Sequence, residues 1–103
     1  RSQARQSAGR SDAAIAPVIT ATTFGKWDAL APAVGSDATL VVAGVSTDCC
    51  VISTVLPAAD AGARITVVTD GCAGSTPENQ AAALQVMGLF PPQVRLCTAA
   101  ELG

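Results

Sequence analysis

The stretch Thr39-Leu-Val-Val-Ala-Gly-Val-Ser-Thr-Asp-Cys-Cys-Val-Ile-Ser-Thr54 decides the fold of this chain. The uninterrupted apolar run from Thr39 to Ala43 predicts a strand of a parallel sheet that is covered on both faces. Gly44 marks a turn after this strand, and a helix is expected from about Thr47 to Ala61. The stretch therefore predicts a strand–turn–helix unit with two adjacent cysteines at the start of the helix.

Segments on both sides of this unit predict further strands and helices. We expect a weak strand at Ile15–Ala21, a helix at Lys26–Val34, a strand at Arg64–Thr69, a helix at Pro77–Met87 and a final strand at Val94–Cys97. Strands that alternate with helices are typical of a parallel sheet with right-handed crossovers. The sequence therefore predicts an α/β fold, a parallel sheet with helices on both faces. Residues 1–14 show no periodicity and are expected to be a flexible N-terminal segment, which leaves residues 15–103 as part of a single domain.

Local signals refine these elements. Thr47 or Asp48 is suited to cap the first N–H groups of the helix that carries the cysteines. Pro57 falls inside that helix and is expected to kink it, because proline cannot donate the usual backbone hydrogen bond. Asp70-Gly71 is expected to be the exit turn of the preceding strand, and Ser75-Thr-Pro-Glu78 predicts a helix start.

Composition limits the chain to one domain with a thin core. Its 103 residues are 50% hydrophobic and 14% charged, with a net charge of −2, and a chain of this size buries only about two thirds of the surface that its unfolded form exposes. The high apolar content suggests a surface that a partner covers. Arg1, Arg5 and Arg10 form a short basic tail, which we expect to be solvated rather than bound to nucleic acid or a membrane.

Targeting signals are not evident in the sequence. No stretch reaches the roughly 18 apolar residues of a membrane-spanning helix, and no signal-peptide pattern opens the chain. We therefore expect a soluble, cytoplasmic protein. The chain does not begin with Met, which is expected of a fragment or a processed product.

The four cysteines do not form the pattern of a disulfide framework, because Cys49 and Cys50 are adjacent and the chain otherwise has the features of an intracellular α/β protein. A zinc site is not expected either, since the sequence has no Cys-x-x-Cys pair and no histidine. The absence of histidine also excludes a Ser-His-Asp or Cys-His mechanism within these residues. We expect no metal and no cofactor, and a structural role for Cys49, Cys72 and Cys97.

Cys50 is the candidate nucleophile. A thiol placed where a strand hands over to a helix lies near free backbone N–H groups and the positive end of the helix dipole, which lowers the pKa of such a thiol. The alternative is that Cys50 is a small buried hydrophobic residue, the usual role of a free cysteine.

The segment around Cys50 resembles the nucleophile segment of the isochorismatase-like cysteine hydrolases, the superfamily of nicotinamidase, N-carbamoylsarcosine amidase and streptothricin hydrolase. Their pattern Gly-Val-(Ala/Ser)-Thr-Asp-x-Cys-Val is matched here from Gly44 to Val51, with Cys50 in the place of the nucleophile. The resemblance extends over about Val18 to Leu102. It implies the C-terminal half of an isochorismatase-like three-layer sandwich, and therefore an incomplete domain.

The resemblance also implies a mechanism. The Cys50 thiolate would attack an amide-type carbonyl carbon, and water would hydrolyse the resulting thioester. The backbone N–H groups of Ser46 and Cys50 would form the oxyanion hole, and the Val45–Ser46 peptide bond would be cis. The cysteine favours amide hydrolysis over the vinyl-ether cleavage of isochorismate, which members without the cysteine perform. Zinc-using nicotinamidases rely on histidines, which this chain lacks.

Two residues of the family's catalytic triad have no clear counterpart. The general-base aspartate comes from the first strand of the full domain, and the lysine position corresponds to Ala21. Lys26 lies nearby and is expected to be a surface charge of a helix. Asp48 and Asp70 are the acids nearest the site, but we expect Asp48 to be a helix-start residue and Asp70 to end a strand and fasten the next turn. The isolated chain is therefore expected to be nearly inactive unless an N-terminal half completes it.

Two functions follow from these observations. The favoured hypothesis is hydrolysis of a small amide-type C–N bond with Cys50 as nucleophile, in a homo-oligomer or in association with the missing N-terminal half. The alternative is a non-catalytic α/β module that acts through subunit assembly. The sequence does not identify the amide substrate, because the specificity pocket would be lined mostly by residues outside it.

Overall fold

The computed structural model describes residues 18–35 and 37–102. The flexible segment predicted at residues 1–14 and the first part of the weak strand predicted at Ile15–Ala21 lie outside these residues. Within the described part of that predicted strand, only Ile19 forms a β-bridge. In the described ranges, no helix is long and apolar enough to span a bilayer.

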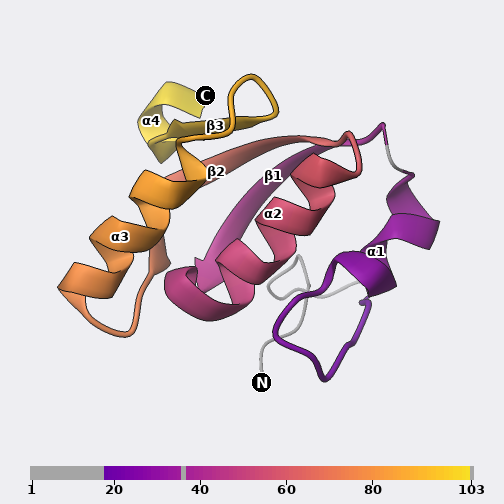
Figure 1. Ribbon diagram of the computed structural model, residues 1–103, viewed down its shortest axis with the longest axis horizontal. Helices are drawn as coiled ribbons and strands as arrows, with labels where there is room; N and C mark the ends of the chain where they lie inside the picture. Colours follow the sequence, from indigo (N-terminus) through magenta and orange to yellow (C-terminus); the bar gives the residue numbers. More distant parts are fainter. Residues whose placement is uncertain (1–17, 36, 103) are drawn as a thin grey trace.

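Strands and helices alternate along the chain and form one parallel sheet. The elements are α1 (Trp27–Val34), β1 (Thr39–Val45), the π-helical turn η1 (Thr47–Val51), α2 (Ile52–Asp60), β2 (Arg64–Ala73), α3 (Pro77–Met87), β3 (Val94–Cys97) and α4 (Ala99–Leu102). The sheet has the order β1-β2-β3, and both strand pairs are parallel. Figure 1 shows α2 and α3 lying across one face of the sheet, with α1 beside α2. The predicted α/β class is confirmed.

The core lies between the sheet and helices α2 and α3. The register places Leu40 beside Ile65 in β2, and Ile65 beside Val94 in β3. Because neighbouring residues of a parallel sheet point to the same face, these side chains form one apolar layer. Val55 of α2 and Met87 of α3 are fully buried in the same cluster. The core is therefore built mainly from aliphatic side chains, as the composition predicts.

Strand β2 is longer than the sequence predicts. The expected exit turn Asp70-Gly71 is wrong, because both residues lie inside the strand. The register between β1 and β2 shifts after Val42, and pairing resumes at Gly44 with Cys72. A Cβ atom at residue 71 would lie only 3.1 Å from the Cβ atom of Ala43, so glycine permits the close approach of the two strands there. The irregularity keeps β2 beside β1 up to the end of both strands.

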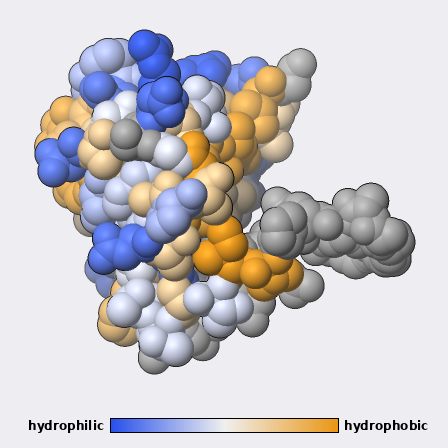
Figure 2. All heavy atoms as spheres, turned by 90° about the vertical axis from the view of Figure 1, so that its right-hand side faces the viewer, coloured by the Kyte–Doolittle hydropathy of each residue, from blue (hydrophilic) through white to orange (hydrophobic). Residues whose placement is uncertain are grey.

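Strand β1 is covered on one face only among the described residues. Its side chains alternate between exposed and half-buried, and Val41 and Val45 are 58% and 57% exposed. The expectation that this apolar run is covered on both faces is therefore not met by the described chain. In β2, by contrast, Ile65 and Val68 point to opposite faces and both are buried. Figure 2 shows hydrophobic side chains in separate patches on the face turned to the viewer.

The helix predicted at Thr47 to Ala61 begins differently from the prediction. It opens with the π-helical turn η1, and α2 follows directly and continues past Pro57 to Asp60. Neither Thr47 nor Asp48 caps this helix, because the preceding Ser46 occupies the cap position and no side chain makes a cap hydrogen bond. The start of α3 agrees with the prediction, since Pro77 opens the helix and the Thr76 side chain accepts a hydrogen bond from the Asn79 N–H.

Two adjacent residues of α3 test whether the core lies where the structure places it. Met87→Ala is expected to lower the free energy of unfolding by about 2–5 kcal/mol, because it leaves a cavity in the packed core. Val86→Ala, on the neighbouring side chain that is 40% exposed, should cost less than about 1 kcal/mol. Urea unfolding followed by circular dichroism measures both. Equal losses from the two substitutions would contradict the described packing of α3.

Candidate active site

The candidate site lies at the carboxyl end of β1, where sites of parallel α/β sheets gather. Gly44 has a φ of 145°, a backbone region that favours glycine. The Val45–Ser46 peptide bond is cis. The family resemblance places a cis peptide at this same bond. The chain therefore leaves the strand through a sharply turned segment and enters η1 at Thr47.

The π-helical turn η1 is held by the carbonyl of Ser46. This oxygen accepts hydrogen bonds from the N–H of Cys49 at 3.1 Å and from the N–H of Val51 at 3.0 Å. Thr47 and Val51 are buried, Cys49 is exposed and Cys50 is half-buried. Turns of this kind occur often at functional sites. The thiol of Cys50 is thus neither sealed in the core nor fully solvated.

Asp48 connects this turn to the start of α3. Its carboxylate accepts hydrogen bonds from the Ser46 hydroxyl at 2.8 Å, from the Ser75 N–H at 3.0 Å and from the Ser75 hydroxyl at 2.5 Å. The Ser75 hydroxyl, followed by that of Ser46, lowers the pKa of Asp48 well below its usual range. Asn79 extends the network by donating to the Ser75 hydroxyl at 3.1 Å. Asp48 is therefore a charged link between two turns rather than the helix cap that the sequence suggests.

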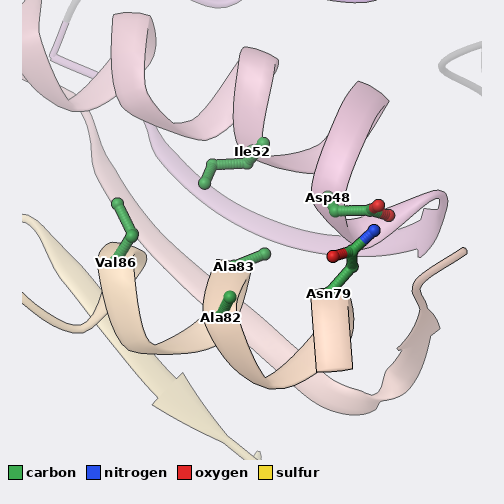
Figure 3. A pocket seen from close by; sticks show the side chains of 6 residues that line it. All are labelled: Asp48, Ile52, Asn79, Ala82, Ala83 and Val86. Carbon is green, nitrogen blue, oxygen red and sulfur yellow. The ribbon is translucent and has the colours of Figure 1, made fainter. Parts of the chain in front are cut away.

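An open groove of about 340 Å³ lies between α2 and α3 beside this network (Figure 3). It is lined by Asp48, Ile52, Asn79, Ala82, Ala83 and Val86. Asp48 and Ile52 are four residues apart and face the same side of the helix, whereas a residue midway between them does not share that face. Cys50 is such a residue and does not line the groove. A substrate of Cys50 would therefore occupy a different side of the turn.

Lys26 is not the surface charge that the sequence analysis expects. It is only 5% exposed, and its ammonium group donates to the carbonyl of Ala21 at 2.9 Å and to the carbonyl of Thr23. A buried charge is costly unless it is hydrogen-bonded, and these two carbonyls satisfy it. The prediction fails because both acceptors belong to an irregular loop whose shape the sequence pattern does not reveal. Ala21, at which the resemblance places the family's lysine, contributes its backbone carbonyl to this contact.

Asp70 forms a hydrogen bond with the start of the last helix, α4. Its carboxylate accepts a hydrogen bond from the Ala99 N–H at 2.9 Å, at the start of α4. The same helix start has a reciprocal pair, in which Thr98 N–H donates to the Glu101 carboxylate at 2.7 Å and Glu101 N–H donates to the Thr98 hydroxyl at 3.2 Å. Helix α4 is not among the elements predicted from the sequence, although Thr98-Ala-Ala-Glu101 has the spacing of a capping box. The expected strand-ending role of Asp70 is replaced by this contact.

The remaining cysteines differ in their surroundings. Cys97 is buried, whereas Cys72 is half-buried and lies beside Gly44 in the strand register. Burial raises the pKa of the Cys72 thiol, and the Gly44 backbone and the Thr47 hydroxyl oppose this rise in part. No disulfide joins any two of the four cysteines, all of which lie in the described part of the chain. Within the described ranges, no group of three or more acidic, cysteine or histidine side chains could hold a metal ion.

The contacts of Asp48 predict how acid affects the fold. A carboxyl group whose pKa is lowered by folding stabilises the folded state above its unfolded pKa of about 4, and this stabilisation is lost as the pH falls through the folded pKa. Asp48→Asn is therefore expected to destabilise the protein at pH 7, and the difference from the wild type should shrink as the pH falls toward about 2.5. Urea unfolding at several pH values measures this difference.

Asp60→Asn is the matched control, because Asp60 is an exposed acid at the end of α2. It should change the free energy of unfolding little at either pH. A loss from Asp48→Asn that stays constant between pH 7 and pH 2.5 would show that the charge of Asp48 does not stabilise the turn.

Comparisons with known proteins identify the family. A family model described as an isochorismatase domain matches residues 13–101. No curated protein matches the chain. Two solved structures show the same fold. An isochorismatase family protein from Desulfovibrio vulgaris is 26% identical with a TM-score of 0.74, and the match covers 93% of this chain and 52% of that one. An isochorismatase-like hydrolase from Alkaliphilus metalliredigens is 27% identical with a TM-score of 0.61, and the match covers 75% and 41%.

This chain therefore spans about half or less of the proteins it resembles. The match of the family model nevertheless covers most of the 103 residues, including the three strands, the cysteine turn and helices α1, α2 and α3. The parallel α/β fold predicted from the sequence agrees with the fold of these neighbours. The chain belongs to the isochorismatase domain family.

Proposed function

We propose that this protein is a hydrolase that cleaves a small amide-type C–N bond with Cys50 as its nucleophile. The observation that carries the proposal is the half-buried Cys50 in η1, the turn that follows the carboxyl end of β1. Membership of the isochorismatase domain family supports a hydrolase in general. The thiol, the first turn of a helix and the end of a parallel strand together support nucleophilic chemistry at this residue.

The proposed reaction has two steps. The Cys50 thiolate attacks the amide carbonyl carbon, and the resulting oxyanion accepts hydrogen bonds from the backbone N–H groups of Ser46 and Cys50. The C–N bond then breaks, the nitrogen takes up a proton and leaves as an amine or ammonia, and a thioester remains. Water attacks this thioester and releases the carboxylic acid and the thiol. Fixed oxyanion donors of this kind are worth about 3 kcal/mol each.

The proton-transfer group is proposed to come from outside the described residues. The charged side chains near the turn have other hydrogen-bond partners: Asp48 contacts Ser46 and Ser75, and Lys26 contacts two loop carbonyls. The carboxylate of Asp70 contacts the start of α4. None of these three is placed by its contacts to take the proton of Cys50. We propose that the remainder of the domain supplies the carboxylate that accepts this proton.

The exposed face of β1 also supports a contribution from outside the described residues. Val41 and Val45 present apolar side chains at an end strand of the described sheet. Exposed apolar surface of this kind marks a contact with another polypeptide. We propose that the remainder of the domain, or a second subunit, packs against this face. The same observation favours the second candidate function, a non-catalytic α/β module that acts through subunit assembly.

Substitution of the cysteine pair separates these two functions. In the intact protein, Cys50→Ala is expected to lower the rate of ammonia release from small primary amides by a factor of about 10³ or more, because no covalent intermediate can form. Cys49→Ala, which removes the exposed neighbouring thiol, should change the rate less than about threefold. Retention of the full rate by Cys50→Ala would exclude Cys50 as the nucleophile. Inactivity of the intact protein on every amide tested would favour the module.

The proposed source of the proton-transfer group predicts the behaviour of the isolated chain. Residues 1–103 alone should hydrolyse amides at least about 10²-fold more slowly than the same residues joined to the remainder of the domain, since a positioned general base contributes about 10² to 10⁴. Circular dichroism and urea unfolding verify that both proteins are folded. Equal rates for the two proteins would show that residues 1–103 already include the complete site.

A further inference from the structure

A single buried hydroxyl joins the cysteine turn to the loop before α1. Thr54 lies one turn after Cys50 and is 7% exposed. Its hydroxyl donates a hydrogen bond to the carbonyl of Cys50 at 2.8 Å and accepts one from the backbone N–H of Lys26 at 2.9 Å. The hydrogen of the hydroxyl is therefore bonded to the turn, and its oxygen is bonded to a segment 28 residues earlier in the sequence.

The loop that Thr54 contacts is itself fixed by hydrogen bonds. The Lys26 ammonium group donates to the carbonyls of Ala21 and Thr23, and the Thr23 hydroxyl donates to the carbonyl of Gly25 at 2.5 Å. Lys26 also occupies the N-cap position directly before α1, and its carbonyl accepts hydrogen bonds from the N–H groups of Ala29 and Leu30. The loop and the first turn of α1 thus form one hydrogen-bonded unit. Figure 1 shows this loop beside the start of α2.

The loop packs closely against the backbone of α2. Pro57 cannot donate a hydrogen bond to the carbonyl four residues earlier, which is that of Ser53. Gly25 lies against this carbonyl, because a Cβ atom at residue 25 would be only 2.7 Å from the Ser53 oxygen. The loop therefore approaches α2 closely, at the position where the helix lacks an N–H donor. This contact lies next to Thr54, whose hydroxyl accepts the hydrogen bond from the Lys26 N–H.

We propose that Thr54 is a positioning residue for Cys50, and that it aligns the cysteine turn with the Ala21–Lys26 loop. The inference deepens the proposed function and rests on Cys50 being the nucleophile. By fixing the Cys50 carbonyl, the Thr54 hydroxyl sets the orientation of the turn that carries both the thiol and its neighbouring N–H groups. Loss of the hydroxyl should let the turn relax, and the thiolate should lose part of the stabilisation that the positive end of the helix provides.

The test is the rate at which iodoacetamide alkylates each cysteine of the intact protein, followed by mass spectrometry of its peptides. Thr54→Val is expected to lower the rate at Cys50 about tenfold near neutral pH and to move its pH profile about one unit higher, since one pKa unit changes the thiolate fraction tenfold. The rate at the exposed Cys49 should stay unchanged. Thr54→Ser keeps the hydroxyl and should restore both the rate and the pH profile of Cys50.

Thr69→Val is the matched control, because the Thr69 hydroxyl also donates to a cysteine carbonyl, that of Cys97, at 3.2 Å. It should leave the Cys50 rate at the wild-type value. A Cys50 rate in Thr54→Val equal to that of the wild type would overturn the inference. A wild-type Cys50 that reacts no faster than Cys49 would instead contradict the proposed function, so that the two failures are distinguishable.

The buried Cys97 reports unfolding in the same experiment. If Thr54→Val unfolds and Cys97 becomes labelled, Gly25→Ala is tested instead. Its added methyl group moves the loop away from α2, and the hydroxyl of Thr54 is kept. A fall in the Cys50 rate of about threefold or more, with Cys97 protected, would support the inference. An unchanged Cys50 rate in Gly25→Ala would overturn it.

Discussion

The hydrogen bonds between Asp48 and Ser75 are the constraint on which the arrangement of the site depends. They join the turn after β1 to the turn after β2, at the carboxyl ends of two neighbouring strands. The low pKa of Asp48 keeps this link charged, and charge-assisted hydrogen bonds are the stronger kind. On the opposite side of the helix, Thr54 holds the Cys50 carbonyl. The cysteine turn is therefore fixed from two directions.

Because the core is thin, one face of the sheet is covered by helices while the other face is exposed at β1. The sheet packs against α2 and α3 on one face, while Val41 and Val45 of β1 remain exposed on the other. The groove beside Asp48 lies on the covered side, and Cys50 does not line it. The chain spans about half of one solved relative and less of the other. In the proposed account, the remainder of the domain therefore completes both the sheet and the site.

Regular elements could be predicted from the sequence because their signals are local. The apolar runs of β1 and β2 and the Thr76-Pro77 start of α3 need only neighbouring residues. The burial of Lys26 could not be predicted, because its acceptors lie in an irregular loop. The extension of β2 past Asp70 depends on pairing with β1 after an irregularity, and the π-helical turn depends on Ser46. Only α4 was missed despite a readable signal, the capping box at Thr98.

The central claim is that Cys50 forms the covalent bond to the substrate. The most direct measurement is rapid acid quenching of the intact protein during turnover of an amide, followed by mass mapping of the cysteine peptides. The account predicts an acyl group on the peptide that carries Cys50, attached to that sulfur and not to Cys49, and its disappearance once the amide is consumed. Turnover without any acylated cysteine, or with the acyl group on another side chain, would contradict it.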